Sequence, residues 1–418
     1  KCILIHGVFI NCVYYMGLSF SSEISLSIPD YIAGTNRFQA INKLLVVNQH
    51  WKKESWGKLK ELFIKMREIG ASDMEVGGPG AKNLIWFRIF GEKTAQKDLG
   101  TFTEDDVTCM MLSVLSDEQK LELFKNKNID FSIGISLAPG EKPSRFRSDV
   151  YYETGSLAGS FRRINQKLFP IDSYEFPDPI SKRINLGYEQ SGLILVTGIT
   201  GSGKSSTLDS IIDLNNHSNS GHIIIIGAPI EFIHDSDQCI VRHRELGDDV
   251  LSFKDGAREA LRQDPDILVV GEMRDASTMA MVLEITDSGH KVFSTLHTSS
   301  AVESIHRIIG EFAADEQERV RLRLADTLSV IISQKLVPNV DGKLVLAKEI
   351  LSVTSSVVAA IRNNNIAEIY QMISEGRKYG MFTIEQDLFN LFKLGKITKE
   401  TAVNYANNKK RMLQLMQA

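Results

Sequence analysis

The chain has 418 residues, 43% of them hydrophobic and 24% charged, which excludes a low-complexity protein and predicts about two to three globular domains. Its net charge of −4 gives the chain as a whole no attraction for nucleic acid. The four cysteines lack C-x-x-C spacing, which argues against a disulfide framework or a zinc site and fits a reducing cytoplasm.

Residues 1–56 contain no motif whose chemistry we can name. The apolar run from Lys1 to Phe20, interrupted by His6 and Asn11, is compatible with a poor signal sequence, a weak membrane segment or a buried pair of strands. Because the chain starts without Met, we favour a duller explanation, a fragment or an over-extended reading frame. We therefore treat residues 1–56 as an uncertain lead outside the expected fold.

Residues 57–168 are predicted to form an amino-terminal α+β domain. Apolar residues from Trp56 to Ile69 recur at helical spacing, and Gly70 ends the pattern. The remaining elements expected here are strands over 74–78 and 84–90, a helical stretch over 104–126, and strands near 129–137, 145–152 and 160–164.

Arginines cluster on the last two expected strands, at Arg145, Arg147, Arg162 and Arg163. They are either solvated charges on the polar face of an antiparallel sheet or arginine fingers that reach a phosphate across a domain or subunit boundary. From the local sequence alone, the solvated face is the preferred interpretation.

A segment rich in proline and acidic residues, 169–180, predicts a hinge, so we assign 169–185 as a linker. Behind it, LILVTGITGSGKSSTLD (residues 193–209) gives the order strand, Gly-rich loop, helix. Its loop, which runs from Gly198 to Ser205, matches the P-loop pattern G-x-x-x-x-G-K-[ST] in full. In such a loop, backbone N–H groups and the positive end of the following helix surround phosphate groups.

The motif therefore predicts a site for ATP and Mg²⁺. Lys204 is expected to reach the β- and γ-phosphates, and Ser205 to supply a hydroxyl ligand to Mg²⁺. The residues assigned to nucleotide binding are Gly198, Thr200, Gly201, Ser202, Gly203, Lys204, Ser205 and Ser206.

Residues 186–350 alternate apolar strands with helical patterns, which predicts a mostly parallel sheet with ligands at the carboxyl ends of its strands. Glu272 follows the strand 267–270, which we expect next to the P-loop strand, and is the preferred catalytic residue and a candidate Mg²⁺ ligand. An ion pair of Glu272 with Arg274 is the structural alternative. His297, after the strand 291–295, is a candidate contact for the γ-phosphate, although a single histidine there is usually only a satisfied polar residue.

Taken together, these motifs resemble those of the secretion ATPase superfamily of type II secretion and type IV pili, above all the twitching-motility (pilus retraction) branch. The resemblance covers about residues 59–407. Besides the P-loop it rests on GASDM (70–74), PIEFIH (229–234), IVRHRELGDDVLSF (240–253), ALRQDPDILVVGEMRD (260–275), GHKVFSTLHT (289–298) and KYGMFTIEQDLFNLF (378–392).

The resemblance implies a RecA-like P-loop domain of the α/β class, a smaller PAS-like α+β domain before it, and a helical carboxyl-terminal region over 351–418. It implies that Glu272 is the catalytic glutamate, that His290 and His297 form a histidine box, and that Arg145, Arg147 and Arg162 are donated by the amino-terminal domain. The four-cysteine zinc module and longer amino-terminal extension of assembly and secretion ATPases are missing from this sequence, which favours the retraction branch and no zinc.

One segment departs from the family pattern. Where the family's aspartate box reads Glu-Asp-Pro-x-Glu, this chain has Gly227 and Ala228 before Pro229, and only Glu231 remains. If the two missing carboxylates contribute as active-site acids commonly do, turnover falls roughly 10²- to 10⁴-fold. This suggests a second hypothesis, a regulatory paralogue that binds ATP and hydrolyses it slowly.

The main expectation is a Mg²⁺-ATP-dependent motor that forms a homo-oligomer, by resemblance a hexamer, in the cytoplasm at the inner-membrane base of a type IV pilus. Its expected partners are an inner-membrane platform protein and a related ATPase, with no nucleic acid. An ATPase for pilus assembly, type II secretion or DNA uptake is the alternative within the same enzyme class.

Overall fold

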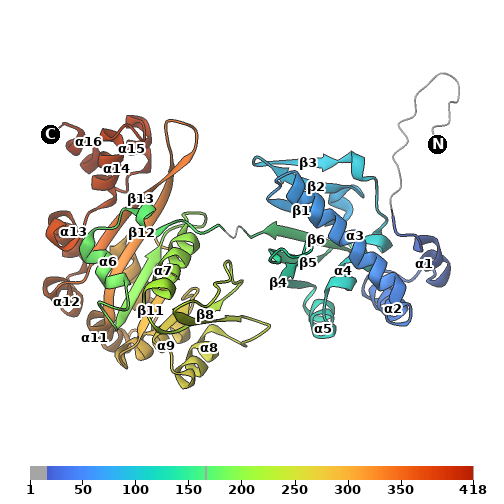
Figure 1. Ribbon diagram of the computed structural model, residues 1–418, viewed down its shortest axis with the longest axis horizontal. Helices are drawn as coiled ribbons and strands as arrows, with labels where there is room; N and C mark the ends of the chain where they lie inside the picture. Colours follow the sequence, from blue (N-terminus) through green and yellow to red (C-terminus); the bar gives the residue numbers. More distant parts are fainter. Residues whose placement is uncertain (1–16, 165–166, 418) are drawn as a thin grey trace. The chain divides into compact units, whose positions relative to one another are not determined.

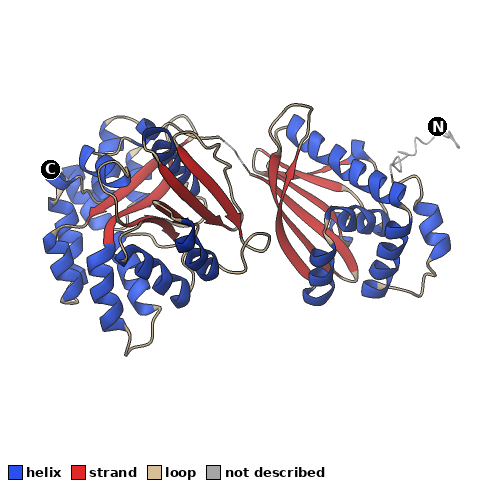
Figure 2. Cartoon of the chain, turned by 60° about the horizontal axis from the view of Figure 1, so that its bottom comes forward, coloured by secondary structure: helices blue, strands red, loops and turns tan. Residues whose placement is uncertain are grey.

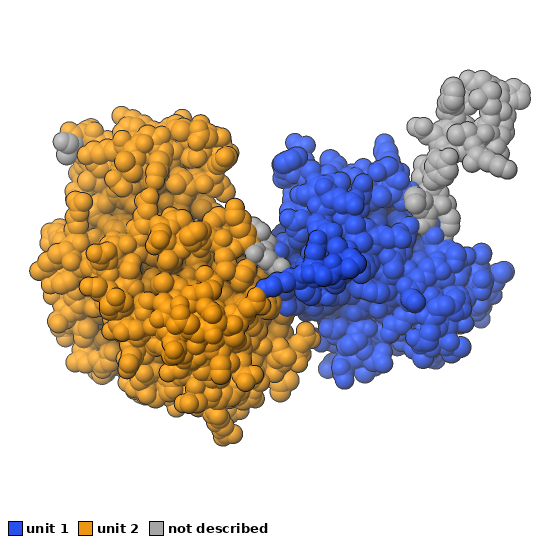
Figure 3. Space-filling model, viewed as in Figure 1, with its two compact units in different colours: residues 1–166 blue, residues 167–418 orange. Residues whose placement is uncertain are grey.

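The computed structural model describes residues 17–164 and 167–417, and the chain divides into two compact units, residues 1–166 and 167–418 (Figure 3). Figure 1 labels most of the helices and strands. No helix of the described residues is both long enough and apolar enough to cross a membrane. Most of the apolar run from Lys1 to Phe20 lies outside the described residues, so its interpretation stays an expectation.

The first unit is an antiparallel sheet with helices on one face (Figure 2). Its six strands lie in the order β3-β2-β1-β6-β5-β4. The elements are α1 (Ser21–Ser27), α2 (Gly34–Val47), α3 (Gln49–Glu68), β1 (Asp73–Gly77), η1 (Pro79–Ala81), β2 (Ile85–Ile89), β3 (Glu92–Gln96), η2 (Lys97–Leu99), α4 (Glu104–Val114), α5 (Asp117–Asn126), β4 (Asn128–Ile135), β5 (Ser144–Glu153) and β6 (Ser156–Arg163).

Alternation along the strands explains this layer arrangement. In β5, Phe146 and Val150 are fully buried in the core that also holds Phe63 and Met66 of α3. Ser148 is buried on the same face, whereas Arg147 and Asp149 point to the opposite, polar face because successive strand side chains alternate.

Two details differ from the sequence predictions in this unit. The helix expected from Trp56 begins at Gln49. Residues before Trp56, including Phe20 and Trp51, are buried in the same core, so residues 17–56 are part of the fold. The stretch expected as one helix over 104–126 is two helices. Ser116 breaks it, because its hydroxyl accepts a hydrogen bond from the Gln119 N–H and starts α5 with a capping box.

The second unit is built on a seven-stranded sheet, in the order β13-β12-β7-β11-β10-β8-β9, parallel except for the β12–β13 pair. Its elements are η3 (Ile171–Tyr174), α6 (Asp178–Ile184), β7 (Gly192–Thr197), α7 (Lys204–Ser218), β8 (Gly221–Gly227), β9 (Cys239–Glu245), α8 (Phe253–Ala260), η4 (Leu261–Gln263), β10 (Ile267–Val270), α9 (Ala276–Asp287), β11 (Lys291–Leu296), α10 (Ala301–Gly310), α11 (Gln317–Thr327), β12 (Leu328–Pro338), β13 (Leu344–Ser352), α12 (Ser355–Arg362), η5 (Ile366–Glu368), α13 (Ile369–Glu375), η6 (Arg377–Tyr379), α14 (Ile384–Lys393), α15 (Lys399–Tyr405) and α16 (Lys409–Gln417).

Helices cover both faces of this sheet, and the strand sequence requires it. In β7, Leu193 and Leu195 belong to the core under α8 to α13, whereas Ile194 and Val196 belong to the core under α6 and α7. A continuous apolar run is typical of a strand buried on both faces. A separate small core joins α14, α15 and α16 to the ends of β12 and β13.

The segment expected as a linker differs from that expectation. Residues 171–184 form η3 and α6, and Ile180 and Ile184 are fully buried against the sheet. The Ser210 hydroxyl of α7 also donates a hydrogen bond to the Phe169 carbonyl, at 2.8 Å. The boundary between the two compact units falls at residues 166 and 167, before this segment.

Candidate nucleotide-binding and catalytic site

The carboxyl ends of the parallel strands bring the candidate residues of the second unit to one edge of the sheet. Thr197 of β7 lies opposite Leu296 of β11, and Val270 of β10 lies between Ile226 of β8 and Ser294 of β11. The P-loop, Glu272 and His297 follow these ends directly. The sequence prediction that β10 neighbours the P-loop strand was wrong: β11 lies between them, because strand order is set by the crossovers and not by local hydrophobicity.

The loop between β7 and α7 has the backbone geometry that its glycines permit. Gly198, Gly201 and Gly203 have φ values of 150°, 80° and 85°, which side-chain-bearing residues rarely adopt. A Cβ on Gly198 would lie 2.6 Å from the carbonyl oxygen of Gln334 on β12, so only glycine fits at this close approach. The helix α7 then begins at Lys204, with its free N–H groups facing the loop.

Lys204 points back into this loop. Its Nζ donates to the carbonyl oxygens of Gly198 (2.9 Å) and Ile199 (3.1 Å). Burial lowers the pKa of Lys204, and the negative charges of Glu272 and Glu231 act in the opposite direction, so both carboxylates are close enough to influence the ammonium group. The Ser202 hydroxyl is buried in the same loop without a hydrogen-bond partner.

Glu272 lies between a histidine and an arginine. Its Oε2 is 3.5 Å from Nε2 of His297, and its Oε1 is 2.5 Å from the guanidinium of Arg274. The Glu272 side chain is only 13% exposed, whereas that of Arg274 is 69% exposed. The ion pair with Arg274 is therefore present, but an arginine this exposed can swing into solvent at little cost.

His297 is held neutral by its surroundings. Burial lowers its pKa most, the positive charges of Lys204 and Arg274 lower it further, and Glu272 opposes them. A neutral imidazole beside a carboxylate and an ammonium group can accept or donate a hydrogen bond at a phosphate or a water molecule. Lys204, Glu272 and His297 therefore form one electrostatic cluster at the mouth of the P-loop.

The segment after β8 carries Gly227, Ala228 and Glu231. Glu231 is exposed, and its charge acts on Lys204, so it lies on the side of the loop that faces the cluster. A Cβ on Gly227 would lie 2.7 Å from Cδ1 of Ile230, the free end of a flexible side chain, and 3.3 Å from the Pro229 carbonyl. A larger residue at position 227 therefore requires Ile230 to move.

His290 is not part of this cluster. It precedes β11 while His297 follows it, so the two histidines lie at opposite ends of one strand, about 20 Å apart at the usual rise per residue. The His290 carbonyl accepts the Gly192 N–H at the start of β7, and its Nδ1 is 3.0 Å from the Ser288 hydroxyl. Within one subunit it supports the base of the sheet.

The candidate arginines lie together on the polar face of the first unit's sheet. Arg147 lies directly opposite Arg162, and Arg145 is two residues along β5 on the same face. Arg162 donates to Asp73 (2.8 Å) and Arg147 to Asp130. Both are exposed, so the ion pairs leave their guanidinium groups accessible from solvent.

Sequence reasoning missed a second carboxylate–histidine pair beside the P-loop helix. Asp209 of α7 lies 3.4 Å from Nε2 of His234, which follows Glu231 by three residues. Burial raises the pKa of Asp209 to about 8 and lowers that of His234 to about 4, so both groups are neutral near pH 7. The sequence signal that could have pointed to His234 was the motif PIEFIH, in which a histidine follows an apolar residue.

The donors present fit a magnesium nucleotide. Among residues 17–164 and 167–417, no three His, Cys, Asp or Glu side chains are grouped so that they could hold a metal ion. Mg²⁺ in nucleotide sites takes few protein ligands and relies on phosphates and water. Ser205 and Glu272 suit that arrangement, and the partnerless Ser202 hydroxyl and the ammonium of Lys204 are donors available to phosphate oxygens.

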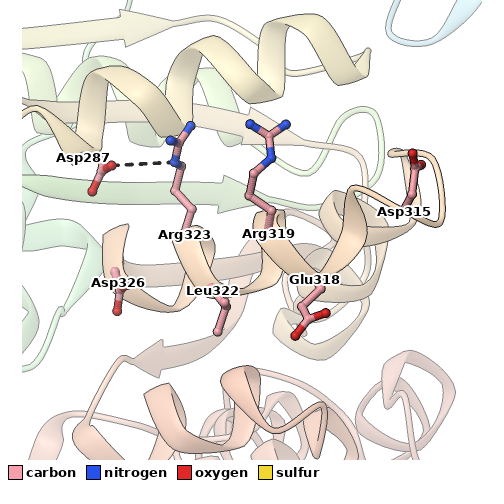
Figure 4. A pocket seen from close by; sticks show the side chains of 7 residues that line it. All are labelled: Asp287, Asp315, Glu318, Arg319, Leu322, Arg323 and Asp326. Atoms are coloured by element: carbon pink, nitrogen blue, oxygen red, sulfur yellow. Dashed lines mark ion pairs between the residues drawn. The ribbon is translucent and has the colours of Figure 1, made fainter.

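A separate pocket of about 490 Å³ lies elsewhere in this unit (Figure 4). Arg319 and Arg323 of α11 extend on the same side in that view, and Arg323 pairs with Asp287, the last residue of α9, at 3.6 Å. Since α9 ends just before β11 begins, the pocket is at the amino-end edge of the sheet, away from the P-loop. Its lining is Asp287, Asp315, Glu318, Arg319, Leu322, Arg323 and Asp326.

The fold and the cluster at its strand ends define a P-loop nucleoside triphosphatase, as the sequence predicted. Comparison with known proteins narrows this class. The family model described as "Type II/IV secretion system protein" matches residues 160–412, and the chain belongs to that family of ATPases.

Several relatives are similar over most of their length. A Pseudomonas aeruginosa protein described as "Type IV pilus retractation ATPase PilT" is 35% identical over 344 residues, which cover 82% of this chain and 96% of that protein. A Neisseria gonorrhoeae "Twitching motility protein" is 36% identical over 316 residues, 75% of this chain and 82% of that one. The crystal structure of the pilus retraction motor PilT with bound ADP shares 37% identity and a TM-score of 0.76, covering 85% of this chain and 98% of its own. The predicted resemblance to pilus retraction ATPases is thereby confirmed.

Proposed function

We propose that this chain is a Mg²⁺-ATP-hydrolysing motor that powers retraction of a type IV pilus. The observation that carries the chemistry is the cluster of Lys204, Glu272 and His297 at the mouth of the P-loop. The process follows from the relatives, which are described as a pilus retraction ATPase and a twitching motility protein.

Each residue of the cluster has a role in hydrolysis under this proposal. Lys204 leaves the loop carbonyls to bind the β- and γ-phosphates, where its charge stabilises negative charge that develops in the transition state. Glu272, freed from Arg274, orients the attacking water and accepts its proton. Neutral His297 donates a hydrogen bond to the γ-phosphate. Ser205 and Glu272 would hold Mg²⁺, which would neutralise phosphate charge.

The remaining candidates act between domains or subunits. We propose that the chain assembles as a homo-oligomer, specifically a hexamer, in which Arg145, Arg147 and Arg162 of one unit approach a nucleotide bound to a second unit. The exposed guanidinium groups of Arg147 and Arg162, with the half-buried Arg145 beside them on the same sheet face, support this role. The oligomer acts in the cytoplasm at the inner membrane, against the platform protein at the pilus base. In such an assembly His290 is available to a neighbouring subunit.

A second candidate rests on Gly227 and Ala228. Glu231 alone supplies a carboxylate from this segment to the cluster, where two more would be expected by resemblance. A chain with this composition would bind ATP and hydrolyse it slowly, and would regulate a related ATPase in mixed assemblies.

Steady-state ATPase assays with Mg²⁺ decide between the candidates. We would compare the unmodified chain with Lys204→Ala, Glu272→Gln and the double variant Gly227→Glu/Ala228→Asp, and record oligomer size on each sample. The motor proposal requires turnover that is lost in the first two variants and similar in the third. Nucleotide binding without turnover, restored at least about tenfold by the double variant, would replace it with the regulatory proposal.

A further inference from the structure

The short segment after His297 is held by residues from the far end of the chain. The Ser299 carbonyl accepts a hydrogen bond from Nδ2 of Asn407, at 3.2 Å, across 108 residues of sequence. Two residues on, the Ala301 N–H donates to Oε1 of Glu349, at 2.9 Å. Residues 298–301 are thus fixed at two backbone points by groups outside the P-loop cluster.

Both groups belong to the region where the carboxyl-terminal helices meet the sheet. Asn407 lies between α15 and α16, and its Oδ1 accepts from Nζ of Lys335 on β12, at 2.6 Å. Glu349 lies on β13, and the backbone N–H of Ile384, the first residue of α14, is close enough to lower its pKa against the effect of burial. One carboxylate therefore lies between the first turn of α10 and the first turn of α14.

This region contains buried carboxyl groups, and the burial of a charged group costs free energy. Glu349 is 2% exposed, and burial raises its pKa to about 7, with Glu385 adding to the rise. Glu385 is fully buried too and accepts the Asn408 N–H at 2.8 Å. Replacement of buried charged groups by apolar residues of similar volume is often neutral or stabilising, so stability alone does not explain this arrangement.

We propose that Asn407 and Glu349 are positioning residues, through which the carboxyl-terminal helices hold residues 298–301 and thereby set the place of His297 relative to Glu272. This proposal rests on the proposed function, since it assumes that His297 contributes to ATP hydrolysis. Neither residue belongs to the cluster of Lys204, Glu272 and His297. A displacement of the helices α14 to α16 shifts the Asn407 side chain, and the Ser299 carbonyl moves with it.

The sharpest variant is Asn407→Asp. It keeps an oxygen for Lys335, and it replaces the N–H donor to Ser299 by a second carboxylate oxygen that carries negative charge. The matched control is Asn404→Ala, at an exposed residue of α15 three positions away whose side chain makes no hydrogen bond or ion pair with the described residues. We expect kcat to fall about 5- to 100-fold in Asn407→Asp with the KM for ATP within about twofold, as for a misplaced catalytic group. The control should match the unmodified chain.

Hydrogen exchange of the nucleotide-free protein gives a readout that needs no turnover. Amides of residues 298–301 should exchange faster in Asn407→Asp than in Asn404→Ala, while those of β11 stay unchanged. Equal exchange in these two variants, or equal kcat, would overturn the positioning role. An unmodified chain that binds ATP without turning it over would instead refute the proposed function, and would leave the exchange result standing.

Glu349 is tested by a pair of variants because truncation risks the fold. Glu349→Gln keeps one oxygen that can accept the Ala301 N–H, so it should keep kcat within about threefold, whereas Glu349→Ala should lose as much as Asn407→Asp. If Glu349→Ala does not fold, the Gln variant still decides. A kcat in Glu349→Gln as low as in Glu272→Gln would show that the carboxylate charge itself takes part, and would contradict a purely positioning role.

Discussion

Two carboxylate–histidine pairs flank the P-loop helix, and their surroundings differ. Glu272 and His297 lie 3.5 Å apart at the open mouth of the loop, with Lys204 and Arg274 beside them. Asp209 of α7 and His234, which follows β8, lie 3.4 Å apart, and the His234 side chain is only 1% exposed. The same two chemical groups at nearly the same distance are thus placed in a charged setting and in a dry one.

This comparison shows that the groups surrounding a carboxylate–histidine pair determine its chemistry more than the two paired side chains themselves do. Burial raises the pKa of Asp209 and lowers that of His234, so this pair is a neutral hydrogen bond that joins α7 to the segment carrying Glu231. Glu272 instead contacts the guanidinium of Arg274 and the imidazole of His297 at the open mouth of the loop, where a carboxylate can accept a proton from water.

The largest effect is expected where the first pair loses its base. Glu272→Gln should lower kcat about 10²- to 10⁴-fold while ATP binding persists, because an amide cannot accept the proton of the attacking water. Turnover and nucleotide affinity are measured on the same samples. Glu284→Gln, an exposed residue of α9, serves as the control and should behave like the unmodified chain. A turnover within threefold of normal in Glu272→Gln would mean that the catalytic base is elsewhere.

Removing the histidine of the first pair should have a smaller effect with a distinct pH dependence. His297→Asn is expected to lower kcat about 10- to 100-fold, since a hydrogen bond to the γ-phosphate is lost. Because the pKa of His297 lies below 6.5, turnover of the unmodified chain should be level at neutral pH and change only at lower pH, where the imidazole gains a proton. That low-pH change should be absent in His297→Asn, and an identical profile in both proteins would contradict the assignment.

The second pair should influence stability and not chemistry. Asp209 has a raised pKa in the folded chain, so its contribution is lost as pH rises toward 8, while His234, with a lowered pKa, adds stability between about 4 and 6.5. Of these two groups only Asp209 titrates between pH 6.5 and 8, and its titration should lower stability by about 2 kcal/mol over that range. Asp209→Asn should abolish this fall and leave kcat unchanged. Urea unfolding followed by circular dichroism at both pH values tests it.

The smallest effect is expected for Arg274, the exposed arginine that forms an ion pair with Glu272. Arg274→Ala removes an ion pair whose guanidinium is largely solvated, so the free energy of unfolding should change by less than about 1 kcal/mol. Its kcat should stay within about threefold if Glu272 releases Arg274 before hydrolysis. A loss comparable to that of Glu272→Gln would make Arg274 part of the catalytic apparatus.

Local sequence was sufficient to predict the elements that carry the site. The strand–loop–helix order around Lys204 and the strand 267–270 before Glu272 are written in consecutive residues, and the structure has both. The roles of these residues stay predictions until the variants are assayed. The position of β11 between β7 and β10 depends on long crossovers, and no local pattern encodes it.

Long-range pairs were beyond the reach of the same reasoning. Asp209 and His234 are 25 residues apart, and Asn407 reaches Ser299 across 108. Each looks in isolation like an ordinary polar residue, and only the folded chain shows that Asp209 is buried or that Asn407 meets a carbonyl. The segment 171–184 was misjudged for a related reason: its prolines suggested a linker, but Ile180 and Ile184 are spaced to bury one side of a short helix.

That short helix decides where the ATPase unit can be cut out for separate study. A recombinant fragment starting at residue 186 would leave uncovered the apolar patch on which Ile180 and Ile184 rest, at a cost of roughly 1.5 to 3 kcal/mol for each isoleucine. Exposed patches of this kind promote aggregation. A fragment starting at residue 167 keeps α6 packed over this patch. Of the two fragments, we expect this one to stay in solution.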